Sequence, residues 1–459
     1  MYSLSAFKAY DIRGIYSKEI DLELAYLVAN AIKIKFNIKS VVIGMDARDS
    51  SQNLVLKLSS TFSEIGVEVV NIGLCTTPML NYAVATNVAE FGIMVSASHN
   101  PKQYNAFKLI SSGPIQVGLE NGLTDIKNLV AQKKLAKLVT PNKKVLGFNI
   151  LPLYIDSIIS KVTINTNKNL KITVDFGNGV GAISAIPLIK QNSNIVLNSL
   201  YKNPNGKFPN HDANPHDIKN FTDLQNSVIK SNSDFGVFFD GDADRCYFVD
   251  EKGNIVMQDL LVCLVAEHEL KNKTYTNRTI YYDLRFTEEI KNVILKNGGV
   301  PKMLPVGNPI YKIYLKEKGG IFGAEFSGHV MFSQNYNIDD GLFLLLKVLQ
   351  IFSNSDKKFS ELIKKYKTYF ASEEISISYK GKINFLLLSK QIKNNFLNYK
   401  SVKIDGLYLK NNSSWLSLRK SNTENILRFR CEADTYENFI NIKQKVLTII
   451  NTFFLVKYF

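Results

Sequence analysis

Short runs of consecutive apolar residues alternate with amphipathic segments along much of the chain. Strands that are apolar throughout are typical of parallel sheets covered by helices on both faces. We therefore predict three repeats of one α/β unit. Their strand-like and helix-like segments are Val41–Gly44, Leu54–Ile65 and Val67–Ile72; Lys171–Phe176 and Ala182–Lys190; and Thr279–Asp283 and Thr287–Lys296.

The C-terminal part has a different pattern. Polar segments rich in Asn and Lys surround short strand-like pieces at Ser414–Leu418 and Ile426–Arg430, and a helix-like segment covers Tyr436–Thr452. This pattern predicts a separate, smaller α+β domain. A chain of 459 residues is also too long for one ordinary core. We predict three similar α/β domains at 1–150, 151–252 and 253–365, followed by the α+β domain at 366–459.

Composition and charge exclude several classes of protein. The four cysteines form no C-x-x-C pair, so disulfides and zinc sites are not expected. Met1–Asp11 carries no secretory signal, and Gly341–Phe352, interrupted by Lys347, predicts a buried helix rather than a membrane span. The net charge of +15 is spread without a basic stripe, so an anionic small substrate is favoured over nucleic acid. We expect a cytoplasmic protein.

An acidic loop follows the apolar run Phe235–Phe239. Asp240, Asp242 and Asp244 stand at alternate positions, and Arg245 comes next. Three carboxylates this close call for a hard divalent cation with oxygen ligands, and the arginine indicates that an anion is also bound. An EF-hand is excluded because Arg245 stands where that loop needs glycine. A phosphatase with Asp240 as nucleophile and Asp242 as acid stays open.

Two further segments carry candidate chemistry, and a third could bind phosphate. Ser98 lies in Ser96–Pro101, where an Asn-Pro turn after the strand-like Phe91–Val95 presents a serine at a sheet edge as a possible nucleophile. Gly323–His329 combines a carboxylate, a hydroxyl and an imidazole, a set suited to sugar hydroxyls. Arg419–Thr423 places short hydroxyl and amide side chains after an arginine, as in a phosphate-binding loop.

These segments, taken in order, resemble the α-D-phosphohexomutase family, specifically its bacterial phosphomannomutase/phosphoglucomutase branch. The resemblance covers nearly the whole chain. It rests on Phe7–Gly14, on Ser98–Pro101 with Asn105–Lys108, on Asp240–Arg245, on Glu325–His329, and on Arg419–Thr423 with Arg428–Asp434.

The resemblance implies an intramolecular phosphotransferase with four domains around a central cleft, the first three built on mixed sheets. It implies interconversion of hexose 1-phosphate and hexose 6-phosphate, of mannose or glucose or both, through a phosphoserine and a bound hexose 1,6-bisphosphate. One Mg²⁺ would be held by Ser98, Asp240, Asp242 and Asp244. The implied catalytic residues are Ser98, Lys108, His329 and Arg13. The implied substrate-binding residues are Tyr10, His99, Arg245, Arg285, Gly307, Asn308, Glu325, Ser327, Arg419, Ser421, Asn422 and Thr423.

Two departures from the family pattern leave the choice of sugar open. Val306–Pro309 replaces the usual Gly-His-Ser/Ala loop, and Arg285 stands where a lysine is expected. Three alternatives remain: a metal-dependent sugar-phosphate phosphatase, a phosphoglucosamine or phosphopentose mutase, and a non-catalytic binder of sugar phosphate or nucleic acid. For the mutase we expect hexose phosphates as partners, no nucleic acid or membrane, and a monomer or weak dimer.

Overall fold

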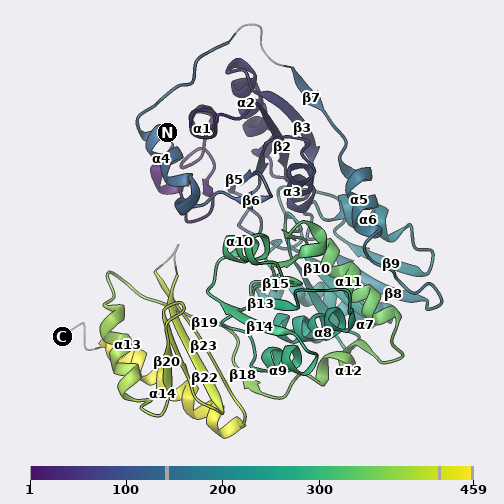
Figure 1. The fold of residues 1–459 in the computed structure, drawn as a ribbon, viewed down its shortest axis with the longest axis vertical. Coiled ribbons are helices and arrows are strands. Elements are labelled where there is room, and N and C mark those ends of the chain that lie inside the picture. Colours follow the sequence, from purple (N-terminus) through teal and green to yellow (C-terminus); the bar gives the residue numbers. More distant parts are fainter. Residues whose placement is uncertain (1, 140–143, 422–424, 456–459) are drawn as a thin grey trace. The chain divides into compact units, whose positions relative to one another are not determined.

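The computed structural model describes residues 2–139, 144–421 and 425–455. Its ribbon is coloured along the sequence in Figure 1. The chain divides into two compact units. The first unit comprises Met1–Gln258 and Tyr311–Leu362, and the second comprises Asp259–Ile310 and Ile363–Phe459. Each unit is described by itself.

The first sheet of the first unit is mixed. Its parallel centre, in which β2 pairs with β3 and β4, agrees with the predicted apolar runs. The antiparallel strands β1 and β5 extend one edge of this sheet, so that the strand order is β1-β5-β4-β2-β3-β7. β6 also pairs with β5. The strands are β1 (Ile12–Ile15), β2 (Ser40–Met45), β3 (Glu68–Leu74), β4 (Phe91–Val95), β5 (Tyr104–Ser111), β6 (Ile115–Gln116) and β7 (Val145–Gly147). The helices are α1 (Leu22–Phe36), α2 (Ser51–Glu64), α3 (Thr77–Ala85) and α4 (Leu123–Ala131).

The second sheet has the same mixed character. β10 runs parallel to β8 and antiparallel to β11, and the strand order is β12-β11-β10-β8-β9. Every residue of β10 is buried, which explains its unbroken apolar sequence. The strands are β8 (Leu170–Asp175), β9 (Ile195–Leu200), β10 (Phe235–Phe239), β11 (Cys246–Asp250) and β12 (Ile255–Val256). The helices are α5 (Leu151–Ile159), α6 (Ala182–Ile189) and α7 (Thr222–Ser231).

The remaining part of the first unit contains an antiparallel set of strands and a buried helix. β15 (Phe322–Ala324), β16 (Val330–Phe332) and β17 (Ile338–Asp339) pair in sequence order. The next helix, α11 (Gly341–Ser353), is the buried helix predicted there, and Asp340 caps its N-terminus by accepting from the Phe343 amide. The chain passes between the units at three places, which lie in α8 (Gln258–Lys271), α10 (Asn308–Lys318) and α12 (Phe359–Lys364).

The second unit contains the parallel pair β13–β14 and the C-terminal sheet. The C-terminal sheet is antiparallel, in the order β18-β23-β22-β21-β20 with β19 also on β23. Helices α13 and α14 pack on it through a shared apolar core, and Figure 1 shows them beside the strands. The elements are α8 (Gln258–Lys271), β13 (Thr279–Asp283), α9 (Glu289–Lys296), β14 (Val300–Leu304), β18 (Phe370–Ala371), β19 (Ile375–Ser378), α13 (Phe385–Asn394), β20 (Lys400–Val402), β21 (Leu407–Lys410), β22 (Ser414–Lys420), β23 (Ile426–Ala433) and α14 (Tyr436–Leu455).

The predicted fold class is therefore correct, with three mixed α/β domains and a smaller fourth domain. Among the described residues, none of the helices combines the length and apolar character that a membrane crossing requires. The domain boundaries stay a prediction.

Candidate active site

The site in the first unit is built on loops that follow buried strands. β4 is buried throughout, runs parallel to β2, and leads into the loop that carries Ser98. β10 runs parallel to β8 and leads into the acidic loop, which returns as β11 with Phe239 opposite Cys246. Because ligands of open α/β sheets bind at the carboxyl ends of parallel strands, both loops are suitably placed.

Ser98 is buried against the acidic loop. Its side-chain oxygen donates to Oδ2 of Asp240 at 2.8 Å and accepts from Nη2 of Arg245 at 2.8 Å. Its backbone adopts a left-handed conformation with φ of 53°, which is uncommon for a residue other than glycine. The structure therefore brings together a hydroxyl and a carboxylate that are 142 positions apart in the sequence.

Asp240, Asp242 and Asp244 form a buried carboxylate cluster that fits a divalent cation. One oxygen from each lies within 4.8 Å of the others. Oδ1 of Asp242 is buried and has no hydrogen-bond partner among the described residues. A buried carboxylate oxygen without a partner is costly, and a cation in this oxygen-rich cluster would satisfy it.

Two buried cations partly neutralise this cluster. Nζ of Lys108 donates to Asp242 at 2.5 Å and to Asp244 at 2.8 Å, and Arg245 pairs with Asp240 and Asp244. Burial raises the pKa of Asp240 to about 7, although Arg245 opposes this effect. At Asp242, burial alone would raise the pKa, but Lys108, Thr77 and Arg245 together outweigh burial and hold the pKa below its usual value. Oδ1 of Asp242 takes no part in these ion pairs, so the cluster keeps an oxygen for a further cation.

Arg13, on β1, contacts the serine loop, which brings it to the predicted reacting end. It donates to the carbonyl of Ala97 at 3.3 Å and to the side chain of Asn100. His99 also lies there, with Nδ1 3.2 Å from Oγ of Ser98. Burial, together with the positive charge of Arg245, lowers the pKa of His99. Tyr10 precedes β1, and its carbonyl accepts from Gln116.

The predicted sugar-binding loop connects β15 and β16. The hydroxyl of Ser327 donates to Glu325 at 3.0 Å. His329 lies beside the acidic cluster, with Nδ1 3.9 Å from Asp244 and 3.1 Å from Asp339. Burial alone would lower the pKa of His329, but the two carboxylates outweigh burial and raise it.

The other predicted residues belong to the second unit. Arg285 is buried between Asp283 and Glu374, so its guanidinium is held by carboxylates in this structure. Arg419 lies on β22, 3.0 Å from Asp405, and the amide of Ser421 donates to Ile426. Asn308 is the first residue of α10, and Gly307, with a φ of 147°, comes directly before it. Asn422 and Thr423 lie outside the described residues.

Several residues at the site were missed by sequence reasoning. Thr77 donates its hydroxyl to Asp242 at 2.6 Å, Asp339 lies between His329 and Lys312, and His216 lies 3.3 Å from Nη1 of Arg245. The Asp-Asp-Gly sequence before α11 was a usable signal for Asp339. No local pattern marks Thr77 or His216, because only the tertiary fold brings them to the site.

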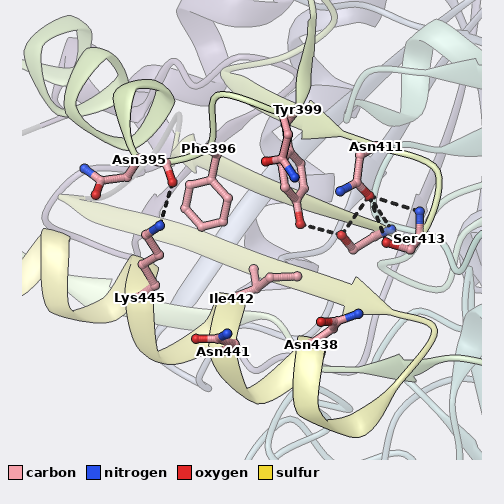
Figure 2. A pocket seen from close by; sticks show the side chains of 11 residues that line it. Asn395, Phe396, Tyr399, Asn411, Ser413, Asn438, Asn441, Ile442 and Lys445 are labelled. Carbon is pink, nitrogen blue, oxygen red and sulfur yellow. Dashed lines mark hydrogen bonds between the residues drawn. The ribbon is translucent and has the colours of Figure 1, made fainter.

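A separate pocket of about 290 Å³ lies in the second unit (Figure 2). α14 contributes Asn438, Asn441, Ile442 and Lys445 to its lining. The pocket also includes Ser414, at the start of β22, whereas Arg419 lies near the other end of that strand. None of the predicted site residues that the structure describes lines this pocket, so it is distinct from the candidate active site.

The fold and the site first define a class. A serine hydroxyl, a carboxylate cluster suited to a divalent cation and two buried cations meet at the carboxyl ends of α/β sheets, an arrangement suited to phosphoryl transfer. Comparison with known families narrows this class. Models of phosphoglucomutase/phosphomannomutase domains I, II and III and the C-terminal domain match residues 4–137, 152–253, 258–369 and 396–449. The chain belongs to the phosphoglucomutase/phosphomannomutase family of α-D-phosphohexomutases.

Individual relatives match this chain over nearly their full length. A phosphomannomutase/phosphoglucomutase of Pseudomonas syringae is 32% identical over 434 residues, 94% of this chain and 91% of the relative. A phosphomannomutase of Methanocaldococcus jannaschii is 31% identical, with 98% of this chain and 97% of the relative covered. The crystal structure of a family member from Burkholderia thailandensis has a TM-score of 0.88 at 27% identity, covering 99% of this chain and 98% of that one.

Proposed function

We propose that this protein is a phosphohexomutase that interconverts the 1-phosphate and 6-phosphate of mannose, glucose or both. The observation that carries the proposal is the contact of Ser98 Oγ with Asp240 and Arg245, each at 2.8 Å. A serine so placed can exchange a phosphoryl group with a sugar, while the neighbouring cations offset the charge of that group.

The proposed reaction has two half-reactions. In the first, the bond between Ser98 Oγ and phosphorus breaks, a bond between the free sugar hydroxyl and phosphorus forms, and the hydroxyl proton leaves. In the second, the hexose 1,6-bisphosphate, turned end to end, returns its other phosphoryl group to Ser98. Lys108 and His329 are the candidates for carrying the protons, because both lie beside the acidic cluster.

Other residues hold the reactants in place. Asp240, Asp242 and Asp244, together with an oxygen on Ser98, would hold one Mg²⁺, which when bound would offset charge on the transferring group. Glu325 and Ser327 are proposed to bind sugar hydroxyls, and Arg419 with Ser421 to bind the phosphate that does not react. Arg285 could bind that phosphate through its planar guanidinium. The four cysteines are buried and unpaired, which supports a cytoplasmic location.

A phosphatase with Asp240 as nucleophile is less well supported. Oδ2 of Asp240 already interacts with Ser98 Oγ and with Arg245, whose Nη2 lies 2.5 Å away. A carboxylate engaged in this way is a poor nucleophile, whereas the serine is the group directed at the cluster.

A coupled assay tests the proposal. Purified protein primed with hexose 1,6-bisphosphate and Mg²⁺ is given mannose 1-phosphate, glucose 1-phosphate or glucosamine 1-phosphate, and both 6-phosphate product and free phosphate are measured. We expect hexose 6-phosphate without stoichiometric release of phosphate. Phosphate release without isomerised sugar would support the phosphatase, and turnover of the amino sugar alone would support a phosphoglucosamine mutase.

A further inference from the structure

A buried arginine outside the predicted site contacts the serine loop. Arg48 lies between β2 and α2 and is 2% exposed. Its guanidinium makes five hydrogen bonds with good geometry. The acceptors are Oδ2 of Asp46 at 2.9 Å and the carbonyl oxygens of Ser98 at 2.8 Å, Asn100 at 2.6 Å, Pro101 at 2.7 Å and Tyr104 at 3.0 Å.

These contacts fix the backbone on which Ser98 stands. Ser98 has a φ of 53°, a conformation that is strained for an L-residue and persists only where the surroundings hold it. Carbonyls that turn inward also need donors, and Arg48 supplies them from one planar group. Because the donors of a guanidinium have fixed relative directions, four carbonyl positions become fixed relative to one another.

Arg48 is itself held on its other sides. Asp46, which pairs with its Nε, also accepts from the hydroxyl of Ser51 at 2.7 Å. The ring of Phe208 lies 5.3 Å from the guanidinium carbon, within range of a cation–π contact. The loop before Phe208 packs closely, since a Cβ on Gly206 would lie 2.4 Å from Cα of Arg48. The arginine is therefore a rigid support with little freedom to follow a shifted loop.

We propose that Arg48 is a positioning residue for phosphoryl transfer. It does not touch the reacting group. It holds Ser98 in the left-handed conformation in which Oγ faces Asp240 and Arg245. This inference rests on the proposed function, because it assigns Arg48 a part in the phosphorylation of Ser98.

The test compares Arg48→Lys with a matched control. Arg278 also donates to four backbone carbonyls, those of Leu270, Asn272, Asn297 and Gly298, but it lies in the second unit. Lysine keeps the positive charge at either position, but it lacks the planar guanidinium with its several N–H donors in fixed directions. For each variant, mass spectrometry at 25 °C measures the single-turnover rate at which glucose 1,6-bisphosphate phosphorylates Ser98. KM and kcat are measured in the coupled assay, and Tm is measured by thermal unfolding.

We expect Arg48→Lys to slow phosphorylation and kcat about 10- to 100-fold with little change in KM, because the nucleophile is misplaced while substrate binding is kept. Arg278→Lys should lower Tm without slowing the reaction. A wild-type rate for folded Arg48→Lys would overturn the inference. Failure of the wild-type protein to phosphorylate Ser98 would instead overturn the proposed function.

A second variant decides the matter if Arg48→Lys does not fold. Phe208→Leu removes the ring beside the guanidinium and leaves all five hydrogen-bond acceptors in place. We expect the phosphorylation rate to fall several-fold with KM unchanged. An unchanged rate in this variant would contradict the positioning role.

Discussion

Asp242 is the carboxylate through which the acidic cluster can be tested most directly. Its Oδ2 accepts from Thr77 and Lys108, and its Oδ1 has no hydrogen-bond partner among the described residues. We predict that Asp242→Asn lowers Mg²⁺-dependent turnover about 100-fold or more, because a charged oxygen ligand is lost while the shape is kept. Turnover is measured across a Mg²⁺ titration.

The control for this substitution is Asp125→Asn. Asp125 is an exposed residue of the same unit and pairs with Lys35 on the surface. Its titration curve should match that of the wild-type protein. If Asp242→Asn also gave the wild-type curve, the carboxylate cluster would not be the cation site.

Glu432 should make stability depend on pH in the second unit. It is buried and accepts from Nε1 of Trp415 at 3.0 Å and from the amide of Glu288 at 2.8 Å. Burial raises its pKa from 4.5 to about 7. Between these values the folded chain binds more protons than the unfolded chain, so this contribution to stability is present below about pH 4.5 and is lost as pH rises towards 7.

We predict that Glu432→Gln is more stable than the wild-type protein at pH 8 by roughly 2–3 kcal/mol, with little difference at pH 4.5. Glutamine keeps an acceptor for Trp415 and carries no buried charge. Urea unfolding followed by the fluorescence of Trp415, the one tryptophan of the chain, measures the effect. The exposed Glu437→Gln should show no such difference. A difference between Glu432→Gln and wild type that does not change with pH would contradict the assignment.

Single residues could be predicted where a local pattern carries the chemistry. The alternation of Asp240, Asp242 and Asp244 is visible in the sequence, and so is the Asn-Pro turn after Ser98. Arg48 and His216 could not be predicted, because their contacts join segments that are distant in sequence. The roles of the predicted site residues stay predictions.

At the scale of elements, Gly241 allows the acidic loop to approach the serine loop. A Cβ at this position would lie 2.5 Å from the carbonyl oxygen of Ser98, a backbone atom that cannot rotate away. We predict that Gly241→Ala separates the two loops and lowers turnover about 10- to 100-fold. Gly147→Ala, where a Cβ would have nothing within 4 Å, should keep wild-type turnover in the same assay. Equal activity of the two variants would show that this close approach is not needed.

The strands and helices of the α/β part were largely predictable, because buried parallel strands have continuous apolar sequences. The predicted run Thr279–Asp283 is β13, and the predicted helix Ala182–Lys190 differs from α6 by one residue at its end. The antiparallel strands β1 and β5 were not predicted from periodicity. Their pairing joins Ile12 to Phe107 and depends on tertiary contacts instead of local pattern.

At the scale of the whole molecule, the first unit contains every residue proposed to take part in breaking and forming bonds. Ser98, the aspartate cluster, Lys108, Arg13 and His329 all belong to it, whereas Arg285 and Arg419 belong to the second unit. The proposed division is chemistry in one unit and phosphate recognition in the other. The order of the motifs in the sequence does not show this division, because Arg285 stands between Asp240–Arg245 and Glu325–His329 in the chain. The sequence departs from the family pattern at Val306–Pro309 and at Arg285, so it does not predict the choice between mannose and glucose.

Phosphorylation of Ser98 during turnover is the decisive measurement for a mutase that works through a phosphoserine. The protein is incubated with glucose 1,6-bisphosphate and Mg²⁺, chased with excess glucose 6-phosphate, and analysed by tandem mass spectrometry at each time point. We predict that one phosphoryl group is found on Ser98 and is transferred to the sugar at least as fast as kcat. We also predict that Ser98→Ala is both unlabelled and inactive. Near-normal turnover by Ser98→Ala, or wild-type turnover without phosphate on Ser98, would contradict it.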